Sequence, residues 1–179
     1  EPEFIYKRAK ERGMDFVAIT DHNCIDWALL LKKKYPKEVI VGVEATAYFP
    51  EDGCKVHILL FDIDEKEFSK IQEYRKDIYL LRDYIKSNNI AYSVAHATYS
   101  INADIKTNHL EKLVLLFDVF EVINGGRNNR NNEEWYKFLL SLEKKDIKKM
   151  KEKHKIKPMS EESWIKGFTG GSDDHAGLF

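Results

Sequence analysis

Gly170-Gly171-Ser172-Asp173-Asp174-His175-Ala176-Gly177 lies near the C-terminus and directly follows a short apolar run at positions 165–169. That run has the length of a β-strand, so we expect the residues after it to form a loop at the strand's end. Asp173 and His175 are two residues apart, and such residues point to the same side of an extended chain. A carboxylate beside an imidazole suits a divalent ion such as Mn, Fe or Zn. An isolated Asp-x-His is more often part of a solvated acidic loop, so the rest of the chain decides between these interpretations.

Polar residues recur at the ends of other strand-like segments. Apolar runs of strand length cover residues 15–20, 39–43, 55–61, 91–95 and 119–123, with helical patterns between them. The polar residues that lie in or directly after a strand-like segment are His22, Glu44, His57, His96, Asn124 and Asp173. Strands that alternate with helices predict an α/β fold with a mostly parallel sheet. A site built from the ends of many strands is typical of a barrel, because an open sheet has its site at one switch point.

His57 departs from this pattern, because it lies inside its strand-like run. A hairpin that turns at Pro50-Glu51-Asp52-Gly53 would bring His57 back beside Glu44. Two long helical patterns, at 65–87 and at about 133–153, complete the expected elements. His109 and His154 lie in or beside polar helical segments, so we expect both at the surface.

Composition limits the possible classes of protein. The chain has 179 residues, 43% of them hydrophobic, and a net charge of -1, which predicts one domain and gives no general reason to expect nucleic-acid or membrane binding. Cys24 and Cys54 match no Cys-x-x-Cys motif, so free thiols in a cytoplasmic protein are expected. The sequence begins at Glu1 without an initiator Met, and we expect it to be truncated at the N-terminus. A truncated C-terminus is the second expectation.

Four histidines in or after strands, together with Glu44 and Asp173, are hard to explain as structural residues. Burying charge costs several kcal/mol unless the charge is paired or ligated. Divalent ions bound to these side chains would offset the cost of burying their charge.

Six short segments carry a resemblance to a known family. They are Ile19-Thr20-Asp21-His22-Asn23, Val41-Gly42-Val43-Glu44, Lys55-Val56-His57-Ile58, Ala95-His96, Glu121-Val122-Ile123-Asn124-Gly125 and Gly171-Ser172-Asp173-Asp174-His175. In type and order they resemble the PHP (polymerase and histidinol phosphatase) domain family. The residues at 170–179 and the turn at 49–54 look closest to PHP-like proteins found beside or fused to glycosyltransferases, so a glycosyltransferase is a possible partner.

The resemblance implies a distorted seven-stranded, TIM-like β/α barrel that holds up to three divalent ions, Mn, Zn or Fe. Glu44 would bridge two of these ions, and His57 and His96 would complete the shell of the second. Asp173 would join the first ion. The metal ligands implied in this way are His22, Glu44, His57, His96, Asp173 and His175, the last of which would share the third ion with His22.

The chain departs from the family in one respect. The family opens with a strand that carries His-x-His, and this sequence contains no His-x-His. We expect that strand to lie upstream of Glu1; the alternative is a crippled first site.

The predicted activity is hydrolysis of a phosphate ester by a metal-activated water, with Glu44, Asp173 and His175 as the catalytic residues. Arg127 and Arg130 are candidates for binding the phosphate of a small-molecule substrate, with a solvated loop as the alternative. The lysine-rich segment at 144–157 is expected to be a solvated helix face, so a nucleic-acid substrate is not favoured. The competing hypothesis is a non-catalytic PHP module that binds metal or a phosphorylated ligand and regulates a partner enzyme.

Overall fold

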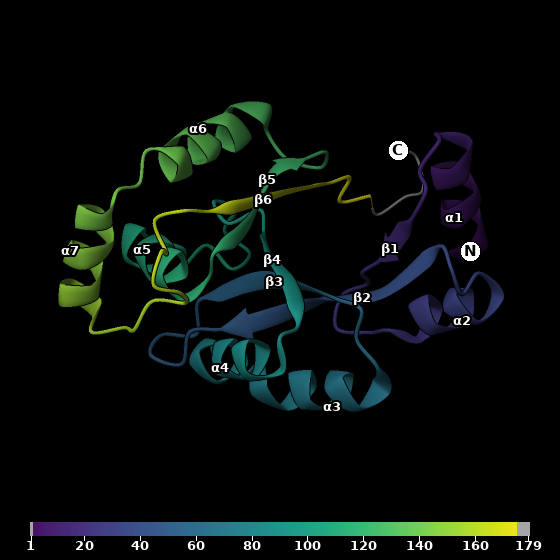
Figure 1. Cartoon of the computed structure of the whole chain (residues 1–179), viewed down its shortest axis with the longest axis horizontal. Helices are drawn as coiled ribbons and strands as arrows, with labels where there is room; N and C mark the ends of the chain where they lie inside the picture. The colour runs from purple at the N-terminus through teal and green to yellow at the C-terminus, as the bar shows by residue number, and fades with distance from the viewer. Residues whose placement is uncertain (1, 175–179) are drawn as a thin grey trace.

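The computed structural model describes residues 2–174, which form six strands and seven helices. The elements, in chain order, are α1 (Pro2–Glu11), β1 (Val17–Ile19), α2 (Asp26–Lys34), β2 (Val39–Tyr48), β3 (Lys55–Phe61), α3 (Glu65–Tyr74), α4 (Ile78–Asn88), β4 (Ala91–Ala95), α5 (Thr107–Leu116), β5 (Val119–Asn124), α6 (Asn129–Leu140), α7 (Lys144–His154) and β6 (Gly167–Gly171). Figure 1 shows them as a curled sheet with α3 and α4 on one side and α5, α6 and α7 grouped at one end.

The six strands form one sheet in the order β1-β2-β3-β4-β5-β6. β3 runs antiparallel to both β2 and β4, whereas the other neighbouring pairs are parallel. The expectation of an α/β fold is therefore confirmed, but the sheet is mixed. Among the described residues the sheet forms part of a barrel with six strands, and the outer edges of β1 and β6 have no partner strand.

The reversal of β3 depends on a tight hairpin. Gly53 has φ +73°, a conformation that favours glycine, and its N–H donates to the carbonyl of Phe49. The Asp52 side chain accepts the N–H of Cys54 and so closes the turn. In the resulting register Thr46 lies opposite His57, which places His57 at the same end of the sheet as the ends of β1 and β4. The hairpin prediction is therefore confirmed.

The two faces of this hairpin have different roles. Glu44, Thr46 and His57 share one face, because neighbours across an antiparallel pair and residues two apart in a strand lie on the same side. Val43 and Ile58 point to the opposite face, where they are fully buried in the hydrophobic core. That core includes residues of α3 and α4, so the site residues lie on the face turned away from those helices.

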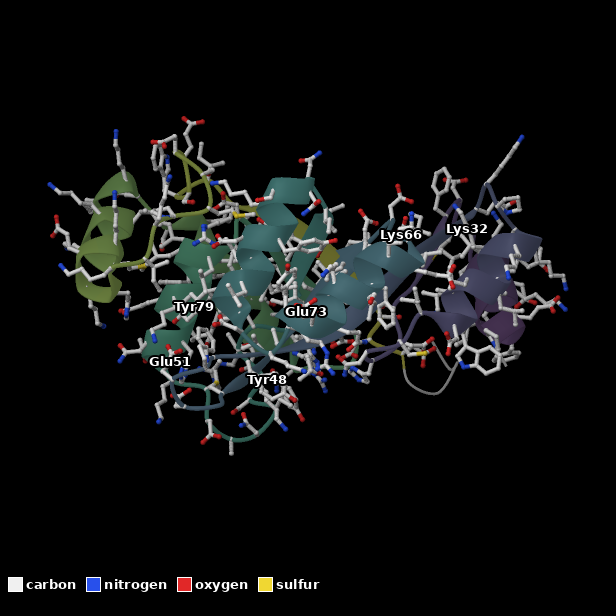
Figure 2. The ribbon with its side chains drawn as sticks, turned by 90° about the horizontal axis from the view of Figure 1, so that it is seen from below. Lys32, Tyr48, Glu51, Lys66, Glu73 and Tyr79 are labelled. Atoms are coloured by element: carbon white, nitrogen blue, oxygen red, sulfur yellow. The ribbon has the colours of Figure 1, made fainter. Side chains whose placement is uncertain are left out.

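The hairpin turn is also held from the helical side. Figure 2 shows Glu51 and Tyr79 close together, and the Tyr79 hydroxyl donates to Glu51 Oε1 over 2.8 Å. Lys112 of α5 forms an ion pair with the same carboxylate. The turn that positions His57 is thus anchored to both α4 and α5.

Both long helices predicted from the sequence are broken. The first divides into α3 and α4 because the Asp77 side chain accepts the N–H groups of Tyr79 and Leu80 and starts a new helix. The second divides into α6 and α7 at positions 141–143, where the Asp146 carboxylate accepts the N–H of Glu143. In both cases a local acceptor competes with continuation of the helix.

Two histidines expected at the surface are instead packed. His109 is buried against Phe49, and its Nε2 lies 3.0 Å from Asp52 Oδ2. The side chain of His154 is largely covered, and its Nε2 lies 2.5 Å from Glu111 Oε2. The eight lysines at 144–157 are all exposed, as predicted. No helix within residues 2–174 combines the length and the apolar character that crossing a bilayer requires.

Candidate metal centre

Glu44 lies in the middle of β2, beside the residues that follow β1. Its N–H donates to the carbonyl of Asp21, and its own carbonyl accepts the N–H of Asn23, each over 3.1 Å. A parallel bridge thus joins His22 to Glu44. This pairing continues the sheet one step beyond β1 and places an imidazole next to the carboxylate.

Asn23 holds this extension in position. It has φ +53°, in the left-handed region that asparagine tolerates better than most residues. Its side-chain Oδ1 accepts the N–H of Thr46, and its Nδ2 donates to the Thr46 hydroxyl. The Gln72 amide of α3 donates to the Asn23 carbonyl. Asn23 therefore fixes the loop that carries His22 to the strand that carries Glu44.

Glu44, His57 and His96 form a compact buried cluster. The Oε1 atom of Glu44 lies 2.5 Å from His57 Nδ1 and 3.1 Å from His96 Nε2. The two imidazole nitrogens are 3.4 Å apart. The sequence-based grouping of these three residues is thus present in the geometry, with side chains contributed by three adjacent strands or strand ends.

His22 lies at the open side of this cluster. Its Nδ1 is 3.8 Å from Glu44 Oε2, its ring centroid is 4.9 Å from that of His57, and its side chain is 44% exposed. Ligand atoms of His22, Glu44 and His57 all lie within 4.8 Å of one another. His22 therefore closes the solvent side, while His57 and His96 close the buried side.

The electrostatic state of Glu44 follows from its neighbours. Burial, the largest effect, would raise its pKa, but hydrogen bonds from His57 and His96 and the charges of His57 and His22 outweigh burial and lower the pKa well below its usual range. Glu44 is therefore an anion near neutral pH, as a metal-ligating carboxylate must be.

The donor set fits a borderline divalent ion. Imidazole nitrogen with carboxylate oxygen suits Zn, Mn or Fe better than the all-oxygen surroundings that Ca and Mg prefer. Ligand atoms on opposite sides of one ion are at most about 4.4 Å apart, since each bond is about 2.0–2.2 Å long. The separations of Glu44 from His57, 2.5 Å, and from His22, 3.8 Å, both lie within that limit.

His96 is held in an uncommon backbone conformation. It has φ +29°, a positive value that non-glycine residues rarely adopt. Its N–H donates to Glu121 Oε2 over 3.0 Å, and the Asn124 side chain donates to the same oxygen over 2.7 Å. Burial, the largest effect, raises the pKa of Glu121 despite these hydrogen bonds. Glu121 thus positions His96 through the backbone N–H of His96.

Asp173 is connected to His96 through an arginine and a tyrosine. Asp173 Oδ2 is 3.1 Å from Arg127 Nη2, and the Arg127 guanidinium carbon lies 3.9 Å from the centre of the Tyr99 ring. The Tyr99 ring meets His96 edge-on, with centroids 5.5 Å apart. A Cβ on Gly126 would lie only 3.1 Å from Asp173 Oδ2, so glycine at this position lets the carboxylate pack closely against the loop after β5.

Two predicted residues remain, Arg130 and His175. Arg130 is on α6 with its side chain 84% exposed, where it forms an ion pair with Glu134. His175 lies outside the described residues, so its relation to His22 stays a prediction. Sequence reasoning gave Tyr99 no specific part in the site and did not single out Asn23; only their packing against distant residues identifies them.

Comparisons with known proteins identify solved structures of similar fold. A scan of protein-family models and a search of curated proteins give no match. Among solved structures, an amidohydrolase from Chromobacterium violaceum, with bound sulfate and no metal, is similar with a TM-score of 0.63 and 14% identity over 97% of this chain and 82% of that one. A candidate metal-dependent phosphoesterase from Bifidobacterium adolescentis is similar with a TM-score of 0.56 and 15% identity over 98% of this chain and 82% of that one. At these identities the similarity establishes a shared fold, in which both neighbours bear hydrolase names.

Proposed function

We propose that this chain is a metal-dependent phosphoesterase of the PHP type. The observation that carries the proposal is the contact of one buried carboxylate, Glu44, with His57 and His96, with His22 completing the group. Four potential ligands from separate segments converge at one end of a curled sheet. The neighbour described as a candidate metal-dependent phosphoesterase has the same fold, which supports this choice.

In this chemistry some residues would bind the metal and others would hold the ligands in position. Divalent ions at His22, Glu44, His57, His96 and Asp173 would supply an activated water at neutral pH and would neutralise the phosphoryl oxygens. Glu44 offers two carboxylate oxygens on the side where three imidazoles converge, so it would be the central anionic ligand of this group. Glu121 holds His96, and Asn23 holds the loop that carries His22. Both contacts keep the ligands in position.

A small phosphate ester is the proposed substrate. Arg127 lies between Tyr99 and Asp173, close to the ligand cluster, and its planar guanidinium suits a tetrahedral oxyanion. The sulfate bound in the Chromobacterium violaceum neighbour is such an oxyanion, held by a protein of this fold. Arg130 is at the exposed surface, so we assign substrate binding to Arg127.

We also propose that a seventh strand completes the barrel between β1 and β6. Both of these strands have an unpaired outer edge within residues 2–174, and open edges are seldom left uncovered. A cavity of about 610 Å³ lies along the β1 side, with Ile5, Ile19, Trp27 and Leu30 among its lining residues. A seventh strand there would cover this apolar surface and bring further ligands to the site.

The test is a screen of phosphomonoesters and phosphodiesters with the full-length protein, stripped of metal and then supplied with Mn, Zn or Fe. The proposal predicts metal-dependent release of phosphate or alcohol that is abolished in a His57→Ala variant. Metal and phosphate binding without turnover of any ester would support the non-catalytic module instead.

A further inference from the structure

Arg127 and Asp173 form an ion pair that is largely shielded from water. Their Nη2 and Oδ2 atoms are 3.1 Å apart, and the side chains are 26% and 6% exposed, respectively. Ion pairs that are partly removed from water are screened less than surface pairs and are correspondingly stronger. The pair therefore influences whatever else binds to this carboxylate.

The same arginine is prepared to bind an anion. Its guanidinium lies on the face of Tyr99, which fixes the plane of the group without using its hydrogen-bond donors. Its Nε–H is buried and has no hydrogen-bond partner among the described residues. Nε and Nη2 together form the side-on fork that binds two oxygens of a carboxylate or phosphate. Nη2 lies 3.1 Å from Asp173 Oδ2 as an ion pair without hydrogen-bond geometry, and Nε makes no hydrogen bond to a described residue.

We propose that Arg127 couples metal binding to phosphate binding by moving between two anions, the Asp173 carboxylate and the phosphate of the ligand. This inference rests on the proposed function, because it requires Asp173 to bind a divalent ion. A dication on Asp173 and a guanidinium on the same carboxylate repel each other over a few ångströms. Arg127 therefore competes with the ion for Asp173, and release from Asp173 frees both Nε and Nη2 for a phosphate over Tyr99.

The coupling has a definite sign. An ion on Asp173 strengthens phosphate binding, since it frees the guanidinium, and by linkage phosphate strengthens binding of that ion. Without Arg127 the ion should bind more tightly when phosphate is absent, and the coupling should disappear. If Arg127 merely orients Asp173 as a ligand, its removal should instead weaken binding of the ion.

The experiment is calorimetric titration of the metal-stripped full-length protein with MnCl2, and then with inorganic phosphate in the presence and absence of Mn²⁺. Arg127→Gln removes the competing charge, Arg127→Lys keeps a charge without the fork, and Arg130→Gln is the matched surface control. Asp173→Asn identifies which Mn²⁺ binding event involves Asp173. Circular dichroism establishes that each variant is folded.

For Arg127→Gln we expect Mn²⁺ to bind about 5- to 20-fold more tightly in the event that involves Asp173, the scale of one partly shielded arginine–carboxylate ion pair. Phosphate binding should weaken and should no longer depend on Mn²⁺. Arg127→Lys should bind Mn²⁺ much as the native protein does but bind phosphate more weakly, and Arg130→Gln should match the native protein in both titrations.

The failures are distinguishable. Mn²⁺ binding that is equal or weaker in Arg127→Gln, in a protein whose native form binds Mn²⁺, overturns the coupling and leaves the proposed function intact. If Arg127→Gln does not fold, an Arg127→Lys variant that binds phosphate as tightly as the native protein overturns the role of the fork. No Mn²⁺ binding to the native protein overturns both proposals.

Discussion

Replacing Glu121 tests whether the metal centre depends on a single buried acceptor. Glu121 is 5% exposed, and its Oε2 accepts hydrogen bonds from the His96 N–H and the Asn124 side chain. Glu121→Ala would leave both donors buried and unpaired, at about 1–3 kcal/mol each, while relieving the cost of burying the carboxylate itself. We expect a net loss of about 2–4 kcal/mol in the free energy of unfolding.

Glu121→Gln separates hydrogen bonding from charge. The amide oxygen can still accept from His96, so the loss should be about 1 kcal/mol or less at neutral pH. Burial raises the pKa of Glu121 in the folded state above its unfolded value of 4.5. The contribution of Glu121 to stability therefore falls as pH rises from 4.5 through the raised pKa, whereas a glutamine at this position contributes no such change. Over that pH range the free energy of unfolding of Glu121→Gln should rise relative to that of the native protein.

Urea unfolding of the metal-stripped proteins at several pH values measures both effects, with the exposed Glu133→Ala as control. Calorimetry with Mn²⁺ supplies a second measurement, because His96, with φ +29°, should relax once its N–H is released and so weaken the site. Stability of Glu121→Ala within about 0.5 kcal/mol of the native protein would refute the reasoning, since surface substitutions alone have effects of that size.

On dialysis of the Mn²⁺-loaded chain against a chelator, the ion at Glu44, His57 and His96 should be the last to leave, because three protein ligands hold it. Elemental analysis of Glu44→Gln should find that ion missing, and its retention would contradict the ligand assignment. An aromatic disulfide reagent at about pH 8 should modify Cys24 in the folded protein but Cys54 only after unfolding, since burial, the largest effect, raises the pKa of the Cys54 thiol to about 11. Equal labelling of both thiols in mass spectra would argue against this packing. Lys166→Met should lower the free energy of unfolding by about 2–4 kcal/mol, because the buried ammonium donates to two carbonyls at the end of α5 and to the Asp118 carboxylate. A thermal melt that matches the native protein would show that these bonds contribute little.

The order and type of most elements follow from local pattern. Apolar runs of strand length mark all six strands, and the turn at Gly53 predicts that β3 reverses and returns His57 to Glu44. The chain direction of β3 relative to β4 has no comparable local signal, so the sheet was expected to be mostly parallel. The break at Asp77 was also missed, because hydrophobic spacing continues across it while one capping carboxylate ends the helix.

The features of the fold and of the site that escaped prediction depend on long-range contacts. His109 looks like a surface residue from its polar neighbours, yet it is buried because Asp52, from the distant hairpin turn, meets its ring. The contact of Arg127 with Tyr99 and Asp173 joins three loops that follow different strands. Residue type identifies the charged and imidazole ligands, whereas the residues that position them are recognisable only once the strands are assembled.

Anomalous diffraction from crystals grown with Mn²⁺ or Zn²⁺ is the most direct test of the central claim, that Glu44, His57 and His96 hold a divalent ion. We predict an anomalous peak bonded to the carboxylate of Glu44 and to the facing nitrogens of His57 and His96, at about 2.0–2.2 Å. A fully resolved site without such a peak, at metal concentrations that support hydrolysis, would contradict the claim.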